Sequence, residues 1–234
     1  MAIDLSTFFK ILPNESGSPD KGPEVYGFFD RRDVPYITFS HAERDRNGYR
    51  GKRVFLIRSP YDVMVSDYFQ QTERLKSYSG SLGDFIRDET NGIKAYCRFM
   101  NGWADHLNDE ADCVVSYEDM SGNTRKTVEK VLEYLLIPVY RGILDQAVSQ
   151  SSFKRMQEME IQEGLAGYRC NSENGLDFRM REGRVGGFRQ HLKQSHMDYL
   201  NNIMKEELNR NARRLLCKHG CMEEVQENFS AFVF

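Results

Sequence analysis

An arginine followed by a Ser-Pro pair stands directly after an apolar run, and this combination suits the binding of an anion. Residues 58–66 read Arg-Ser-Pro-Tyr-Asp-Val-Met-Val-Ser. Ser-Pro is typical of a helix start, so Arg58 is expected at a strand's C-terminal end and beside a helix N-terminus, where anions are favoured. Ser59, Asp62 and Ser66 share one helical face, so guanidinium, hydroxyl and helix dipole together suit a phosphate. A local ion pair between Arg58 and Asp62 is an equally good interpretation.

Two further segments carry side chains that suit an anionic or aromatic ligand. Tyr117 ends a second apolar run and is followed by two acidic residues. It could offer its hydroxyl or stack on a base, although a boundary tyrosine with its hydroxyl in water is the commoner arrangement. Residues 179–189 contain four arginines interleaved with glycines. Glycines let backbone N–H groups approach an anion closely, but a solvated surface loop would have the same composition.

The elements that must position these residues alternate between short strands and amphipathic helices. The expected strands are 36–39, 53–57 and 113–117, and the expected helices begin at Ser59-Pro60 and Ser81 and cover 93–103, 128–135 and 195–218. Near-continuous apolar strands separated by helices predict an α/β fold with a parallel sheet flanked by helices. Residues 1–35 read as an irregular N-terminal segment, and 157–187 as a mobile, glycine-rich lid without periodicity.

Composition bounds the kind of protein. The chain has 234 residues, enough for a single domain covering 1–234. With 32 Lys+Arg and 35 Asp+Glu, the net charge of −3 argues against broad nucleic-acid binding. No apolar run approaches the length of a membrane span, and the N-terminus does not resemble a signal peptide. We therefore expect a soluble, cytoplasmic protein with no membrane partner, whose five scattered cysteines are reduced.

One cysteine-rich segment raises the possibility of a metal. Residues 217–221 read Cys-Lys-His-Gly-Cys. They offer at most three ligands and have no companion pair elsewhere, whereas zinc sites usually show two separated pairs. The end of a helix followed by a glycine cap is the better interpretation, so no metal site is predicted.

Taken together, four motifs resemble the sulfotransferases that use 3′-phosphoadenosine 5′-phosphosulfate (PAPS). Residues 58–66 are similar to their Arg-x-Pro-x-Asp-Val-x-Val-Ser motif, and 115–120 to their strand ending in Tyr-Glu-Asp. Residues 151–156 resemble Ser-Ser-Phe-Lys-x-Met, and 181–189 resemble Arg-Lys-Gly-x-x-Gly-Asp-Trp-Lys. Each motif alone is weak, but all four occur in the family's order. The resemblance runs from about Pro35 to the C-terminus, and it implies an α/β sulfotransferase fold similar to the P-loop nucleotide-binding folds.

The resemblance implies a binding site for the donor nucleotide PAPS and its product 3′-phosphoadenosine 5′-phosphate (PAP). The residues implied at the 3′-phosphate are Arg58, Ser66, Arg181 and Gly183. No metal is needed for this reaction class.

Other matched positions imply contacts to the base and a catalytic group. Tyr117, Ser151 and Phe153 match the residues on the adenine side. An aromatic ring such as Phe153 also suits base stacking on physical grounds. His41 matches the family's catalytic histidine, and a histidine can deprotonate an acceptor hydroxyl near neutral pH.

The chain also departs from the family pattern. Residues 1–35 contain no counterpart of the family's phosphosulfate loop, Pro-Lys-Ser-Gly-Thr-Thr-Trp, or of the strand before it. Glu182 stands where the family has Lys, so its carboxylate should point away from a phosphate, and Phe188 stands where the family has Trp. We therefore expect a sheet without its first strand. We also expect weak PAP binding, little sulfate transfer by this chain alone, and a strand, loop and helix encoded upstream of Met1.

The resemblance thus implies a sulfotransferase that moves a sulfuryl group from PAPS to a hydroxyl or amine of a small-molecule or glycan acceptor. The alternative is a non-catalytic PAP-binding or interaction protein derived from such an enzyme by loss of the phosphosulfate loop. A remnant that binds nothing is a third, weaker possibility. The acceptor and the oligomeric state are not determined by the sequence.

Overall fold

The computed structural model describes residues 52–108, 111–163 and 182–223. Two strands in these ranges, β1 (Arg53–Ile57) and β2 (Asp112–Ser116), pair in parallel. Arg53 lies opposite Asp112 and Ile57 opposite Ser116, so both strands end at the same edge of the sheet. The predicted parallel pairing is confirmed, and it brings the residues that follow each strand close together.

Helices account for most of the rest of the described chain. Between the strands lie α1 (Pro60–Phe69), its π-helical continuation η2 (Gln70–Arg74), α2 (Leu82–Phe85) and α3 (Ile93–Ala104). After β2 come α4 (Tyr117–Gly122), α5 (Thr124–Tyr134), α6 (Arg141–Gln150), α7 (Phe153–Glu163), the 3₁₀ turn η3 (Gly187–Gln190), α8 (Gln194–Glu207) and α9 (Arg210–Lys218).

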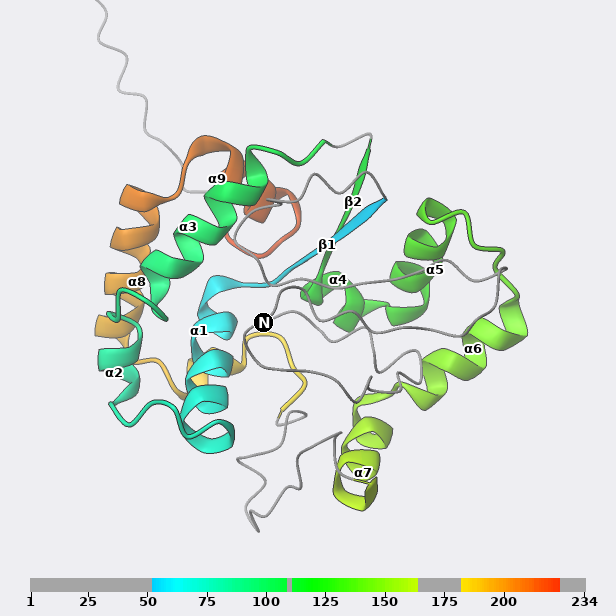
Figure 1. Ribbon diagram of the computed structural model, residues 1–234, viewed down its shortest axis with the longest axis horizontal. Coiled ribbons are helices and arrows are strands. Elements are labelled where there is room, and N and C mark those ends of the chain that lie inside the picture. Colours follow the sequence, from blue (N-terminus) through cyan, green and yellow to red (C-terminus); the bar gives the residue numbers. More distant parts are fainter. Residues whose placement is uncertain (1–51, 109–110, 164–181, 224–234) are drawn as a thin grey trace, which may run out of the picture.

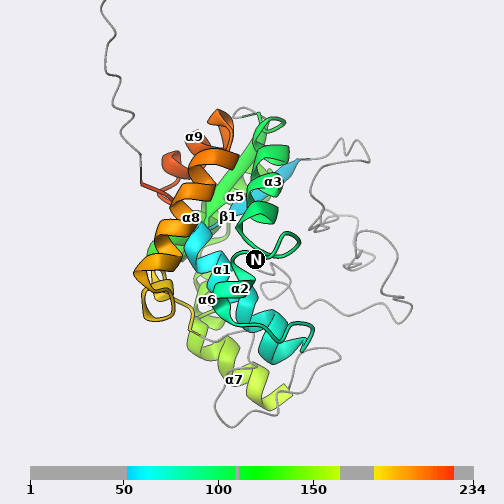
Figure 2. The same cartoon turned by 90° about the vertical axis from the view of Figure 1, so that its left-hand side faces the viewer.

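The helices flank the two strands, as an α/β fold requires. In Figure 1, α1, α3, α8 and α9 lie to one side of β1 and β2, and α4, α5 and α6 lie to the other. The view turned by 90° in Figure 2 shows α9 at one end of the molecule and α7 at the other. This arrangement confirms the predicted fold class.

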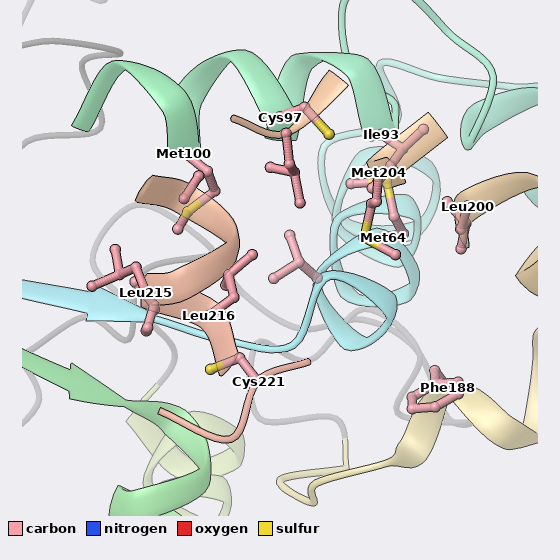
Figure 3. Close-up of a cluster of buried hydrophobic side chains, with 14 of the residues drawn as sticks. Met64, Ile93, Cys97, Met100, Phe188, Leu200, Met204, Leu215, Leu216 and Cys221 are labelled. Atoms are coloured by element: carbon pink, nitrogen blue, oxygen red, sulfur yellow. The ribbon is translucent and has the colours of Figure 1, made fainter. Parts of the chain in front are cut away.

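The main core lies between β1 and the helices α1, α3, α8 and α9, which present apolar side chains to one another (Figure 3). The helices α3, α8 and α9 have the apolar stripe expected of a helix that packs on one face, whereas α1 buries the nearly continuous run 60–65. The labelled core residues are Met64, Ile93, Cys97, Met100, Leu200, Met204, Leu215 and Leu216, all nearly or fully buried. Burial raises the pKa of the Cys97 thiol to about 12, so this cysteine stays neutral in the core.

An ion pair joins the two strands at the edge opposite their C-terminal ends. Arg53 donates from Nε to Asp112 Oδ1 at 2.6 Å and from Nη2 to Oδ2 at 2.8 Å. The Asp112 carboxylate is buried and also accepts the backbone N–H of Asn108 at 2.9 Å. This bidentate pair fixes where the two strands begin.

Three details of the sequence prediction are wrong. Tyr117 does not end a strand but begins α4, because Ser116 Oγ accepts the N–H of Asp119 at 3.0 Å and caps that helix. The segment without periodicity does not begin at Gln157, because α7 continues to Glu163. The predicted helix 195–218 is two helices, since the Asn209 side chain accepts the Ala212 N–H at 2.8 Å and starts α9 anew.

Other predictions fall on residues outside the described ranges. These are the strand 36–39, the irregular segment 1–35 with its missing first strand, and the part of the predicted lid at 164–181. In the described ranges, no helix is both long and apolar enough to cross a membrane.

The predicted helix start at Ser81 is confirmed and gives a test of the fold. Ser81 Oγ accepts the Asp84 N–H at 3.2 Å, and Asp84 Oδ2 accepts the Ser81 N–H at 3.1 Å, which forms a capping box. Replacing Ser81 by Ala should lower the free energy of unfolding by about 0.5–2 kcal/mol. Urea denaturation measures this loss. Ser149→Ala, at an exposed site within α6, is the control; an equal loss there would contradict a capping role for Ser81.

Candidate nucleotide-binding site

The site begins where β1 passes into α1. Ser59 is the N-cap residue of α1 and Pro60 its first residue, as predicted. The Ser59 side chain makes no capping hydrogen bond; its backbone N–H donates to Glu118 Oε1 at 2.9 Å instead. Glu118 lies in the first turn of α4, directly after β2. One carboxylate therefore ties together the two segments that follow the parallel strands.

The segment that ends α9 contacts the Glu118 carboxylate. Gly220 has a φ of +67°, its N–H bonds the Cys217 carbonyl at 3.0 Å, and the Cys221 N–H bonds the Leu216 carbonyl at 2.9 Å. This Schellman motif confirms the predicted glycine cap. It directs the Cys221 thiol to Glu118 Oε2 at 3.3 Å. Burial, and then the Glu118 carboxylate, raise the pKa of Cys221, so the thiol keeps its proton and acts as a donor.

Arg58 lies at the centre of the site, between the ends of β1 and β2. Its guanidinium carbon is 4.0 Å from the centroid of the Tyr117 ring, and its Nη2 donates to the Arg184 carbonyl at 3.3 Å. The Nε atom is buried and has no hydrogen-bond partner in the part of the chain that the structure describes. A buried N–H of a cation that lacks an acceptor is costly, so it indicates a place for a further anionic or polar group.

Tyr117 is held close to this arginine by its place at the start of α4. Burial is the main cause that raises the pKa of its hydroxyl, while the positive charge of Arg58 acts in the opposite direction. The hydroxyl therefore remains protonated in the neutral pH range. A neutral aromatic ring on a guanidinium is a cation–π contact, which fixes the plane of the Arg58 side chain.

Asp62 does more than form the local ion pair that the sequence left open. Its Oδ2 lies 3.9 Å from Arg58 Nη2, which is a long ion pair. The same carboxylate, buried within the structure, accepts the Gly186 N–H at 2.7 Å and the Phe188 N–H at 2.9 Å. Both interpretations of Arg58 are thus compatible, because the ion pair leaves Arg58 Nε without a partner.

The glycine-rich loop after residue 182 packs directly on the start of α7. Gly183 has a φ of +63°, a conformation that suits glycine. A Cβ atom at this position would overlap three carbons of the Phe153 ring. Only glycine can therefore bring the backbone this close to the ring.

Glu182, the residue that departs from the family pattern, has partners of its own. Its Oε1 lies 3.1 Å from His191 Nε2, and its Oε2 lies 3.6 Å from Arg184 Nε. Its negative charge is thus met by neighbours within the same loop region. The predicted orientation away from a phosphate stays a prediction.

A chain of contacts brings four of the predicted site residues together. Tyr117 contacts Arg58, Arg58 bonds the carbonyl next to Gly183, and Gly183 contacts Phe153. These residues come from four segments that are far apart in the sequence: the end of β1, the start of α4, the start of α7 and the loop before η3.

The structure places two other predicted residues on the same elements. Ser66 is half-buried in α1, and Ser151 is the half-buried C-cap residue of α6, two positions before Phe153. His41 and Arg181 lie outside the described residues. The roles of these four stay predictions.

Sequence reasoning missed the residues that hold the site in shape. Glu118 and Cys221 fix the start of α1, and Asp62 and the Tyr61 ring fix the loop, since Tyr61 stacks on Phe188 with ring centroids 4.9 Å apart. Asp62 itself was expected in the first turn of a helix, as a partner of Arg58. Nothing in the sequence indicated that its partners lie 124 and 126 positions away.

The structure is that of an α/β protein in which Arg58 and Tyr117 directly follow two parallel strands. Residues 49–212 match the sulfotransferase domain family, and the chain belongs to this family. The family resemblance seen in the sequence is therefore confirmed.

Several characterised proteins are similar to this chain. Mouse sulfotransferase 2A1 is 26% identical over 164 residues, which are 68% of this chain and 57% of the mouse protein. The 3-beta-hydroxysteroid sulfotransferase of Cavia porcellus is 26% identical over 203 residues, 83% of this chain and 67% of that protein. The amine sulfotransferase of Oryctolagus cuniculus is 23% identical over 194 residues, which are 76% of this chain and 63% of that protein. The chain thus spans little more than half the length of the mouse relative.

Solved structures show the same fold. Mouse sulfotransferase SULT7A1, crystallised with PAP, aligns with a TM-score of 0.56 at 16% identity, over 70% of this chain and 61% of its own. Retinol dehydratase, crystallised with androsterone and the inactive cofactor PAP, aligns with a TM-score of 0.53 at 18% identity. The alignment covers 68% of this chain and 48% of the retinol dehydratase chain. At these identities the likeness shows the fold alone.

Proposed function

We propose that this chain is a PAPS-dependent sulfotransferase domain that transfers a sulfuryl group to a hydroxyl or amine acceptor. The observation that carries the proposal is the buried Nε of Arg58 at the C-terminal edge of the two strands, which has no hydrogen-bond partner among the described residues. Ligands of open α/β sheets bind at this edge. The neighbouring N-terminus of α1 adds the positive end of a helix dipole, which favours a phosphate.

The residues present fit the donor nucleotide. Arg58 would hold the 3′-phosphate, because its fork of N–H groups suits a phosphate and one of them lacks an acceptor. The Phe153 ring, which packs on the backbone of Gly183, suits stacking on the adenine. We also assign Ser66 and Arg181 to the 3′-phosphate and Tyr117 and Ser151 to the adenine side, on the strength of the motifs that they match.

PAPS supplies the activated sulfuryl group when it is bound. The domain would act by positioning donor and acceptor in line, as in phosphoryl transfer. We propose His41 as the base that takes the proton from the acceptor hydroxyl, since an imidazole titrates near neutral pH.

A small-molecule acceptor is the substrate class that the relatives favour. The proteins similar to this chain are named for hydroxysteroids and for amines. We propose an acceptor of one of these classes, a hydroxyl on an apolar skeleton or a primary amine.

Two measurements test the proposal. Isothermal titration with PAP should show binding to the 234-residue chain, and labelled PAPS with a hydroxysteroid or an amine should show sulfate transfer. Since residues 1–35 lack a recognisable phosphosulfate loop, we expect slow transfer, so PAP binding is the deciding result. Binding without any transfer would reduce the function to nucleotide binding. No binding of PAP would overturn the proposal.

A further inference from the structure

A contact between α1 and the loop 186–188 joins two of the motifs that resemble the family, and sequence reasoning gave this contact no role. The Asp62 side chain is nearly inaccessible, with a residue exposure of 3%. Its two oxygens each accept a backbone N–H, from Gly186 at 2.7 Å and from Phe188 at 2.9 Å. Hydrogen bonds to a buried carboxylate are about twice as strong as those between neutral groups.

A second, apolar contact joins the same two segments. The Tyr61 ring stacks on the Phe188 ring with an interplanar angle of 26°. Phe188 is itself buried, and Tyr61 also contacts Asn201 of α8 through its hydroxyl. The loop is therefore held to α1 by two polar bonds and one stacked pair.

The same helix start carries the arginine of the candidate nucleotide site. Asp62 Oδ2 is 3.9 Å from Arg58 Nη2, and that nitrogen also donates to the Arg184 carbonyl at 3.3 Å. Asp62 thus accepts hydrogen bonds from the loop 186–188 and also lies close to the Arg58 guanidinium. Moving the loop would remove the carbonyl that orients Arg58.

We infer that Asp62 is a positioning residue that presets the nucleotide site before ligand binds. It holds the backbone at 183–188 against α1, so that Arg58 Nε stays directed away from the protein's own acceptors. A preset site binds more tightly because less freedom is lost on binding. This inference rests on the proposed function, and it concerns how the site is ordered rather than which residues touch the nucleotide.

The test compares Asp62→Asn with Asp112→Asn. Asp112 is also buried, also accepts a backbone N–H and also pairs with an arginine, but it lies at the opposite edge of the sheet. Asp62→Asn should weaken PAP binding by about tenfold, whereas Asp112→Asn should change it less than about twofold. The loss should be smaller for adenosine 5′-monophosphate, which lacks the 3′-phosphate that Arg58 would contact. Equal losses for the two nucleotides, or for the two variants, would overturn the inference.

Two further measurements keep the test decisive. Amide hydrogen exchange at Gly186 and Phe188, without nucleotide, should be slow in the wild-type chain and clearly faster in Asp62→Asn. Tyr61→Leu removes the stacked ring and should loosen the same amides and weaken PAP binding, which covers the case in which Asp62→Asn does not fold. Unchanged PAP affinity in a folded Asp62→Asn would refute the inference and leave the proposed function standing. If the wild-type chain does not bind PAP, the proposed function fails. In that case, equal exchange of the Gly186 and Phe188 amides in the wild type and in Asp62→Asn would also show that Asp62 does not hold the loop.

Discussion

Replacing Arg58 by Ala is expected to weaken PAP binding by roughly ten- to a hundred-fold. A hydrogen bond to a charged group contributes about 1.5–3 kcal/mol, and each tenfold change in affinity corresponds to about 1.4 kcal/mol. The stability of the fold should change little, because Asp62 keeps its two backbone donors when the arginine is absent. Isothermal titration gives the affinity, and thermal unfolding gives the stability.

The specificity of that loss is the informative part. Adenosine 5′-phosphosulfate lacks the 3′-phosphate, so its affinity should hardly respond to Arg58→Ala. Arg125→Ala is the matched control, since this exposed arginine pairs with Asp145 and Glu129 far from the strand ends. If Arg58→Ala weakened both nucleotides to the same extent, Arg58 would have a structural role and would not contact the 3′-phosphate.

Replacing Gly183 by Ala is expected to weaken PAP binding at least about tenfold. The left-handed backbone costs a residue with a Cβ roughly 1–2 kcal/mol, and here the Cβ would also overlap the Phe153 ring. The loop must therefore move away from α7, which displaces both the glycine backbone and the aromatic ring from their places in the site. The melting temperature should fall together with the affinity.

Gly220→Ala separates these two effects. Gly220 has a φ of +67°, nearly the same as that of Gly183, but no atom lies within 4 Å of the position its Cβ would take. This variant should lose stability through backbone strain but keep the contact between Gly183 and Phe153, so it should lose less affinity for PAP than Gly183→Ala. Equal affinities for PAP in Gly183→Ala and Gly220→Ala would show that the contact with Phe153 has no part in binding. A double variant, Gly183→Ala with Phe153→Leu, should recover part of the lost stability by giving the new methyl group room.

Local sequence patterns determined much of the fold around the site. The apolar run before Arg58 formed a strand in which Phe55 and Ile57 are buried, and the Ser-Pro pair started a helix where predicted. The capping box at Ser81 and the glycine cap at Gly220 also formed as their residue types require. These features depend on neighbours within a few positions, so the sequence carries the whole of their physical cause.

The predicted bounds of helices were wrong at two places, the helix predicted over 195–218 and the segment after Gln157. Asn209 interrupts an otherwise continuous helical pattern because its side chain caps α9, and the apolar stripe continues on either side of it. Sequence reasoning expected no periodicity from Gln157 onward, yet α7 continues to Glu163 and places the Phe153 ring beside Gly183.

The sequence by itself determined which residues could bind a nucleotide, because four motifs stand in the order of the sulfotransferase family. The tertiary structure decided how Arg58 is used. The ion pair between Arg58 and Asp62 is local. The other contacts join distant parts of the chain: Asp62 accepts a hydrogen bond from the Gly186 N–H, and Arg58 contacts the Arg184 carbonyl and the Tyr117 ring. Such contacts arise when parallel strands bring their C-terminal ends to one edge of the sheet, and no pattern of neighbouring residues encodes them.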